Sequence, residues 1–123
     1  MYKIHTRITI EGAHKLNLNY ESACCNLHGH RWQVDIYIVS EVLNDNGMVI
    51  DFTSIKKCIK DKLDHKVLNE VEPFNEINPT AENLAQVISD WVQDICNNEG
   101  NKPFCYRVDV WETENNQASW TVK

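Results

Sequence analysis

Residues 28–39 read HGHRWQVDIYIV, and this stretch determines the fold that we expect of the chain. Apolar residues occupy every second position from Trp32 to Ile38, and the positions between them are polar or aromatic. Because successive side chains of a strand point to opposite faces, this alternation predicts a half-buried strand from His30 to Glu41.

The same alternation appears earlier in the chain, at residues 2–12, and predicts another strand. One face of it consists of Ile4, Thr6, Ile8 and Ile10. The period is lost over residues 13–29, which collect Asn, Ser, Cys, His and Gly, so we expect a long loop there. Loops of that length in compact domains are usually functional or disordered. The sequence Asn44-Asp45-Asn46-Gly47 predicts a turn after the second strand.

Two helices are expected in the second half of the chain. Asp51 is the expected N-cap of a helix over about 53–63, and Thr80 that of a helix over about 81–97. The apolar stripe of the second helix consists of Leu84, Ile88, Trp91 and Ile95.

Alternation returns at residues 104–113, and residues 117–122 can pair back as a last short strand. The element order is therefore ββααββ, which predicts an α+β fold with a four-stranded antiparallel sheet and both helices on one face.

Composition narrows the classes of protein that fit. The chain has 123 residues, the length of a single domain spanning 1–123. Its formal net charge of -6 argues against nucleic-acid binding by bulk charge, and no apolar run is long enough to cross a membrane. The five cysteines are an odd number in irregular places, which is typical of a reduced, cytoplasmic protein.

His28-Gly29-His30 is the sharpest local motif. Residues i and i+2 of an extended segment point to the same side, so the two imidazoles converge. His14, just past the end of the first expected strand, comes close to them if the two strands pair. Three neutral imidazoles with a vacant fourth position describe a catalytic zinc site. The alternative is a pair of solvated histidines.

Other residues also allow two interpretations. Cys24 and Cys25 precede His28 closely, and either is a reactive thiol or a small buried side chain. If the segment is extended, only one of the two can face the histidines. Asp64 and His65 are adjacent, and form either a proton relay or a solvated pair at a helix end.

Glu112 continues the alternation of Tyr106, Val108 and Val110, where an apolar residue is expected. A carboxylate in that stripe needs a partner or water. It suits recognition of two parallel N–H donors on a heterocycle, unless the strand ends at Val110 and the carboxylate is simply solvated.

Six ordered motifs together resemble the 6-pyruvoyltetrahydropterin synthase family, which includes the bacterial 6-carboxytetrahydropterin synthases of the queuosine pathway. The resemblance runs from about Ile4 to Trp120. The motifs are Ala13-His14, Cys24-x3-His28-Gly29-His30, Gly47 to Phe52, Leu63 to Asn69, Asn78 to Asn83, and Trp111-Glu112-Thr113.

The resemblance implies the tunnelling fold (T-fold), whose ββααββ order matches the order expected above. It also implies trimers whose sheets form one barrel. Two trimers stack into a homohexamer, with active sites between subunits.

The resemblance further implies a role for each site residue. His14, His28 and His30 bind Zn²⁺. Cys24 is the catalytic cysteine, Asp64 and His65 are its partners, Glu112 anchors the pterin, and Thr80 and Glu82 contribute to the pterin site. Cys25 stands where some relatives carry a Glu that directs a different side-chain cleavage.

The implied substrate is 7,8-dihydroneopterin triphosphate. The implied product is 6-carboxytetrahydropterin, with release of triphosphate and acetaldehyde. The alternatives are the 6-pyruvoyl product of the same substrate and a non-catalytic pterin- or metal-binding module.

Overall fold

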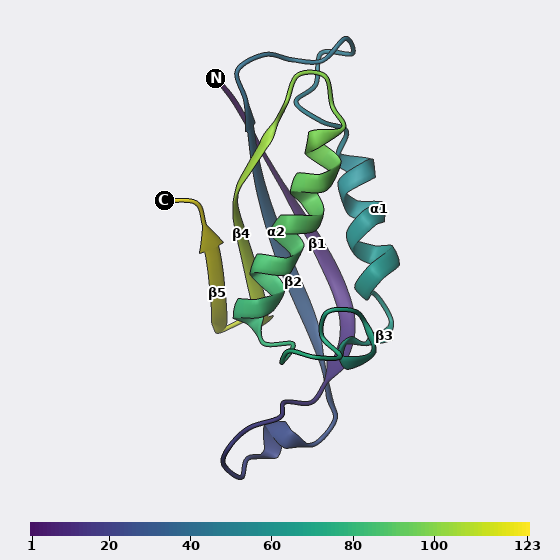
Figure 1. The fold of residues 1–123 in the computed structure, drawn as a ribbon, viewed down its shortest axis with the longest axis vertical. Helices are drawn as coiled ribbons and strands as arrows, with labels where there is room; N and C mark the ends of the chain where they lie inside the picture. The colour runs from purple at the N-terminus through teal and green to yellow at the C-terminus, as the bar shows by residue number, and fades with distance from the viewer.

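A long hairpin forms the centre of the sheet in the computed structural model, which describes residues 1–123 (Figure 1). Its strands, β1 (Tyr2–His14) and β2 (His28–Ser40), pair antiparallel along their whole length. The second hairpin consists of β4 (Phe104–Thr113) and β5 (Asn116–Thr121), and β4 pairs with β2.

The expected fold class is confirmed, but the sheet has one strand more than the expected four. The additional strand, β3 (Lys66–Val67), pairs in parallel with β1 at Gly12 and Ala13. The strand order is β3-β1-β2-β4-β5. A strand of two residues has no periodicity, so the sequence carries no signal for it.

Both helices cover one face of the sheet (Figure 1), as expected. They are α1 (Phe52–Leu63) and α2 (Ala81–Asn97). The Asp51 side chain accepts a hydrogen bond from the Thr53 N–H, and the Thr80 hydroxyl accepts one from the Asn83 N–H. These caps satisfy N–H groups that have no partner within the helix, which explains where each helix begins. Neither helix is long and apolar enough to span a membrane.

The core lies between these helices and the sheet, and α2 turns a slightly different face to it than the spacing predicts. Val92 and Cys96 are fully buried, whereas Trp91 and Ile95 are only half-buried.

Tyr106 also departs from its expected place. The β2–β4 pairing is irregular at Tyr37/Ile38, and Cys105 takes the buried position opposite Ile38. The Tyr106 ring lies beside Tyr37, on the face away from the helices.

That second face of the sheet is polar, and two carboxylates lie buried within it. Asp35 and Asp109 are direct cross-strand neighbours. Arg7 and His5 donate to Asp35, and Arg107 donates to Asp109. Like charges opposite each other destabilise a sheet, so each carboxylate depends on its own cationic partner.

Candidate functional site

Three histidines converge at the end of the β1–β2 hairpin, on the face that carries the helices. His14 lies directly opposite His28 in the register, and His30 follows two residues later on the same face. The ring centroids are 4.6 Å apart for His14 and His28, 4.9 Å for His28 and His30, and 5.2 Å for His14 and His30. One ligand nitrogen from each ring lies within 4.8 Å of the others. The strands run two residues further than expected at this end, and this extension brings His14 and His28 together.

Two main-chain carbonyls fix the orientation of these rings. His14 Nδ1 lies 2.8 Å from the Pro79 oxygen, and His28 Nδ1 lies 2.7 Å from the Asn26 oxygen. A carbonyl oxygen only accepts, so each Nδ1 carries the proton and each Nε2 presents a lone pair. The sequence does not predict this contact of Pro79, because every residue has a main-chain carbonyl and no residue type marks the one that is used.

Two of the remaining ring nitrogens are buried and have no hydrogen-bond partner. Neither His14 Nε2 nor His30 Nε2 has a hydrogen-bond partner. Burial is the main cause that lowers the pKa of both histidines, so both rings are neutral at neutral pH. Unpartnered buried polar atoms are costly, whereas neutral imidazole nitrogens are good ligands for divalent transition metals. The cluster can therefore hold a metal ion, and its three nitrogen donors fit an open zinc site.

Glu112 lies at the edge of this cluster. Its Oε1 is 3.6 Å from His30 Nε2, and its side chain is 31% exposed. Glu112 lies within β4, at the point between Trp111 and Thr113 where the β4–β5 pairing is irregular. The carboxylate is therefore not a freely solvated strand end, and it lies next to the histidine cluster.

Thr80 and Glu82 lie at the start of α2, directly after the carbonyl that orients His14. The Thr80 hydroxyl is 3.1 Å from the Asn83 nitrogen that it caps, and Glu82 is exposed. The structure thus gives Thr80 a capping role, and gives Glu82 no contact with the histidines.

Asp64 and His65 lie at the edge of β1 on which β3 pairs, and they do not join the histidine cluster. Asp64 Oδ1 accepts from the Glu11 N–H, and the His65 N–H donates to the Glu11 carbonyl. The His65 ring is 79% exposed, with Nε2 3.7 Å from Asp64 Oδ2. His65 has a φ of 57°, a left-handed conformation that is uncommon outside glycine. Such a conformation is a frequent sign of functional constraint.

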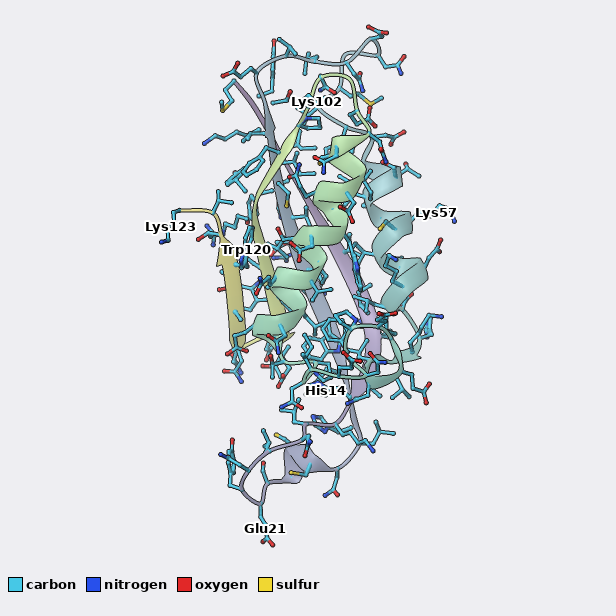
Figure 2. The ribbon with its side chains drawn as sticks, in the orientation of Figure 1. His14, Glu21, Lys57, Lys102, Trp120 and Lys123 are labelled. Carbon is cyan, nitrogen blue, oxygen red and sulfur yellow. The ribbon has the colours of Figure 1, made fainter.

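The loop that contains Glu21 extends beyond His14 at the end of the sheet (Figure 2). Cys24 belongs to this loop, which connects β1 to β2. Cys24 and Cys25 belong to a short 3₁₀ helix, Ala23–Cys25, so the segment is not extended at these two residues, and the condition under which only one of them could face the histidines is not met. Cys24 is half-buried, whereas Cys25 is exposed. The Cys24 carbonyl accepts from the Leu16 N–H at 2.8 Å.

Comparison with known proteins identifies relatives over the whole chain. The family described as 6-pyruvoyl tetrahydropterin synthase matches residues 3–122. A 6-carboxy-5,6,7,8-tetrahydropterin synthase of Bacillus subtilis is 31% identical over 99% of this chain and 86% of its own. The human 6-pyruvoyl tetrahydrobiopterin synthase is also 31% identical, over 93% of this chain and 87% of its own. The structure of the Caenorhabditis elegans 6-pyruvoyl tetrahydropterin synthase shares the fold with a TM-score of 0.77 at 23% identity, covering 99% of this chain and 96% of that one.

Proposed function

This chain belongs to the 6-pyruvoyl tetrahydropterin synthase family, and we propose that it is a zinc-dependent 6-carboxy-5,6,7,8-tetrahydropterin synthase. Its substrate is 7,8-dihydroneopterin triphosphate, and its products are 6-carboxytetrahydropterin, triphosphate and acetaldehyde. The observation that carries the proposal is the cluster of three histidines, two of them with buried unpaired Nε2 atoms, beside the Glu112 carboxylate.

His14, His28 and His30 hold Zn²⁺ through their Nε2 atoms in this proposal. Bound zinc would supply Lewis acidity, which stabilises negative charge on oxygen atoms of the substrate side chain. The carbonyls of Pro79 and Asn26 keep two of the rings in the ligating tautomer, as outer partners of metal-bound histidines commonly do.

Glu112 binds the pterin ring. An ionised carboxylate only accepts hydrogen bonds, and the 2-amino group and N3–H of a pterin present two parallel donors to it. The position of Glu112 beside His30 would place the ring's side chain next to the histidines. Thr80 and Glu82 contribute to the same pterin site from the start of α2.

Cys24 is the base that removes a proton from the substrate side chain, and His65, held by Asp64, handles a second proton. In one chain, the Cys24 carbonyl accepts from the Leu16 N–H on one edge of the segment that continues β1, whereas the His65 N–H donates to the Glu11 carbonyl on the opposite edge of β1. We therefore propose that the active site is completed between subunits, with His65 of one copy serving Cys24 of another.

A homohexamer, built as two trimers, is the assembly that we propose. β3 covers β1 only at Gly12 and Ala13, so most of that edge of β1 is open, and β5 forms the other open edge. Open edges of this kind are templates for pairing with another strand, here from a second copy.

The wider setting follows the same proposal. The 123 residues act as a single domain in queuosine biosynthesis. The five unpaired cysteines support a location in the cytoplasm, where reducing conditions keep thiols free.

The test is mass spectrometry of the product formed by the purified, zinc-loaded protein from 7,8-dihydroneopterin triphosphate. The proposal predicts 6-carboxytetrahydropterin together with acetaldehyde and triphosphate. A 6-pyruvoyl product without acetaldehyde would establish the alternative synthase. The human 6-pyruvoyl tetrahydrobiopterin synthase, which is as similar in sequence as the Bacillus subtilis relative, favours that alternative. Zinc and pterin binding without turnover would instead establish a binding module.

A further inference from the structure

Two asparagine side chains clamp the main chain that follows β1. Asn69 Oδ1 accepts from the Lys15 N–H at 2.9 Å, and Asn69 Nδ2 donates to the Lys15 carbonyl at 2.8 Å. Likewise, Asn78 Oδ1 accepts from the Asn17 N–H at 2.8 Å, and Asn78 Nδ2 donates to the Asn17 carbonyl at 3.0 Å. Each primary amide thus replaces the pair of hydrogen bonds that a neighbouring strand would supply.

These clamps continue a series that begins within the sheet. Alternate residues of a strand direct their N–H and C=O groups to the same edge. On this edge of β1, Glu11 is paired by Asp64 and His65, and Ala13 by β3. Lys15 and Asn17 are the next two positions on this edge. Their main-chain groups hydrogen-bond to the amide side chains of Asn69 and Asn78 instead of to another strand. The two amides therefore hold the segment 15–17 by hydrogen bonds of the kind that a strand would make, although no strand lies beside it.

The opposite edge of the same segment holds the cysteine loop. Leu16 lies between the two clamped residues, and its N–H donates to the Cys24 carbonyl at 2.8 Å. Because the direction of the Leu16 N–H depends on the backbone of Lys15 and Asn17 on either side, we expect the position of Cys24 to depend on both clamps.

The clamp at Asn78 is itself firmly held. The Asn78 carbonyl accepts from the Thr80 N–H at 2.8 Å and from Asn83 Nδ2 at 2.9 Å. The next residue, Pro79, orients His14. The turn that precedes α2 thus orients His14 through Pro79, and it holds the cysteine loop through Asn78 and Asn17.

We propose that Asn69 and Asn78 are positioning residues for Cys24, a role that rests on the function proposed above for that thiol. They hold the segment 15–17 in register, and this segment fixes where the Cys24 loop lies relative to the histidines. Ordering an exposed loop costs conformational entropy at every residue, and the four amide hydrogen bonds offset part of that cost.

The test uses N69D and N78D, which keep the accepting oxygen and nearly the same shape but lose the donor to the Lys15 or Asn17 carbonyl. Asn75→Asp is the matched control, because Asn75 is an exposed asparagine of the same connection with no side-chain hydrogen bond. We expect kcat to fall by roughly 10–100-fold in both clamp variants, as for misplaced catalytic groups, with KM and zinc content near those of the parent.

Two measurements do not require turnover. Amide hydrogen exchange at Leu16 should accelerate in N69D and N78D, and the rate of Cys24 alkylation by iodoacetamide should change, while N75D matches the parent. Parental exchange, alkylation and kcat in both clamp variants would overturn the inference. A lower melting temperature with parental kcat would also overturn it, since that result describes a purely structural role. If the parent chain forms no pterin product, the proposed function fails, whereas exchange and alkylation still decide whether the clamps position Cys24.

Discussion

His14 donates its Nδ1 proton to the carbonyl of Pro79 across 2.8 Å, in the buried interior and between residues 65 positions apart. This contact connects the end of the first strand to the turn before α2. Because the acceptor belongs to the main chain, the orientation of His14 depends on the course of that turn rather than on a second side chain. A histidine held this way presents Nε2 to the cluster without needing a carboxylate partner.

Metal content should depend on the cluster and not on histidine in general. We expect about one zinc per chain in the parent, as a three-ligand site requires. His28→Ala should weaken zinc binding by more than the roughly 10–100-fold typical of losing an outer partner. His65→Ala should keep parental zinc, since His65 lies outside the cluster. Elemental analysis after dialysis and competition with a chromophoric chelator measure both. Full zinc occupancy in H28A would refute the cluster as the metal site.

Glu112→Gln should lose pterin affinity while keeping zinc. The variant replaces one accepting oxygen with a donor, which then faces the N–H edge of the ring. Leaving such charge-assisted partners unpaired costs on the order of 2–5 kcal/mol of binding free energy. Calorimetric titration with a pterin measures the loss, and Glu114→Gln, an exposed neighbour, is the control. Unchanged pterin affinity in E112Q would place the anchor elsewhere.

Cys24 and Cys25 should differ in their contributions to turnover. Cys24→Ala should lose about 10²–10⁴-fold in kcat, the usual cost of removing a general base, and should still bind zinc and pterin. Cys25→Ala should remain active, because Cys25 is exposed and its thiol faces the Tyr20 carbonyl of its own loop. Steady-state rates of the two variants make the comparison. An inactive C25A beside an active C24A would show that the role belongs to the second thiol.

Asp35 should link stability to pH. Burial alone would raise the pKa of Asp35, but hydrogen bonds from Arg7 and His5 outweigh it, and the pKa is lowered. The stabilisation is therefore present above the unfolded-state value of 3.8 and is lost as pH falls through the lower folded-state value.

At neutral pH, Asp35→Asn should reduce the free energy of unfolding by about 1.5–3 kcal/mol, the range for hydrogen bonds to a charged group. It should also flatten the dependence of stability on pH below that value. Urea denaturation at several pH values measures this. Asp45→Asn, at an exposed turn residue, should leave the profile unchanged. A D35N profile that parallels the parent would show that other groups cause the acid sensitivity.

Mixed assemblies should test whether subunits share the active site. C24A and H65A are each expected to be inactive alone. In co-expressed hexamers of the two, about one site in four combines an intact Cys24 with an intact His65 from a neighbouring copy, and activity should return. Sedimentation checks that mixed hexamers form. Mixed hexamers without activity would place Cys24 and His65 of the same chain in one site.

The parts of this structure that sequence predicts well are those with local causes. The start and end of α2 agree with expectation, because Thr80 provides the cap and the chain turns polar after Asn97. At the histidine end of the central hairpin, the expected strands stop two residues short of the observed ones, because glycine does not favour strands and only the pairing extends them. The convergence of His28 and His30 followed from the period of a strand. The contacts of Pro79, Asn69 and Asn78 could not be predicted, since they join main chain and side chains distant in sequence.

The residue-by-residue pairing of β1 with β2 has a consequence for folding fidelity. A slip of one residue in that hairpin would send the side chain of His14 to the opposite face from His28 and His30. A misregistered chain would then offer at most two of the three nitrogens. Because a ligand that binds only the native arrangement stabilises that arrangement, metal available during synthesis would select the correctly paired hairpin over its slipped alternatives.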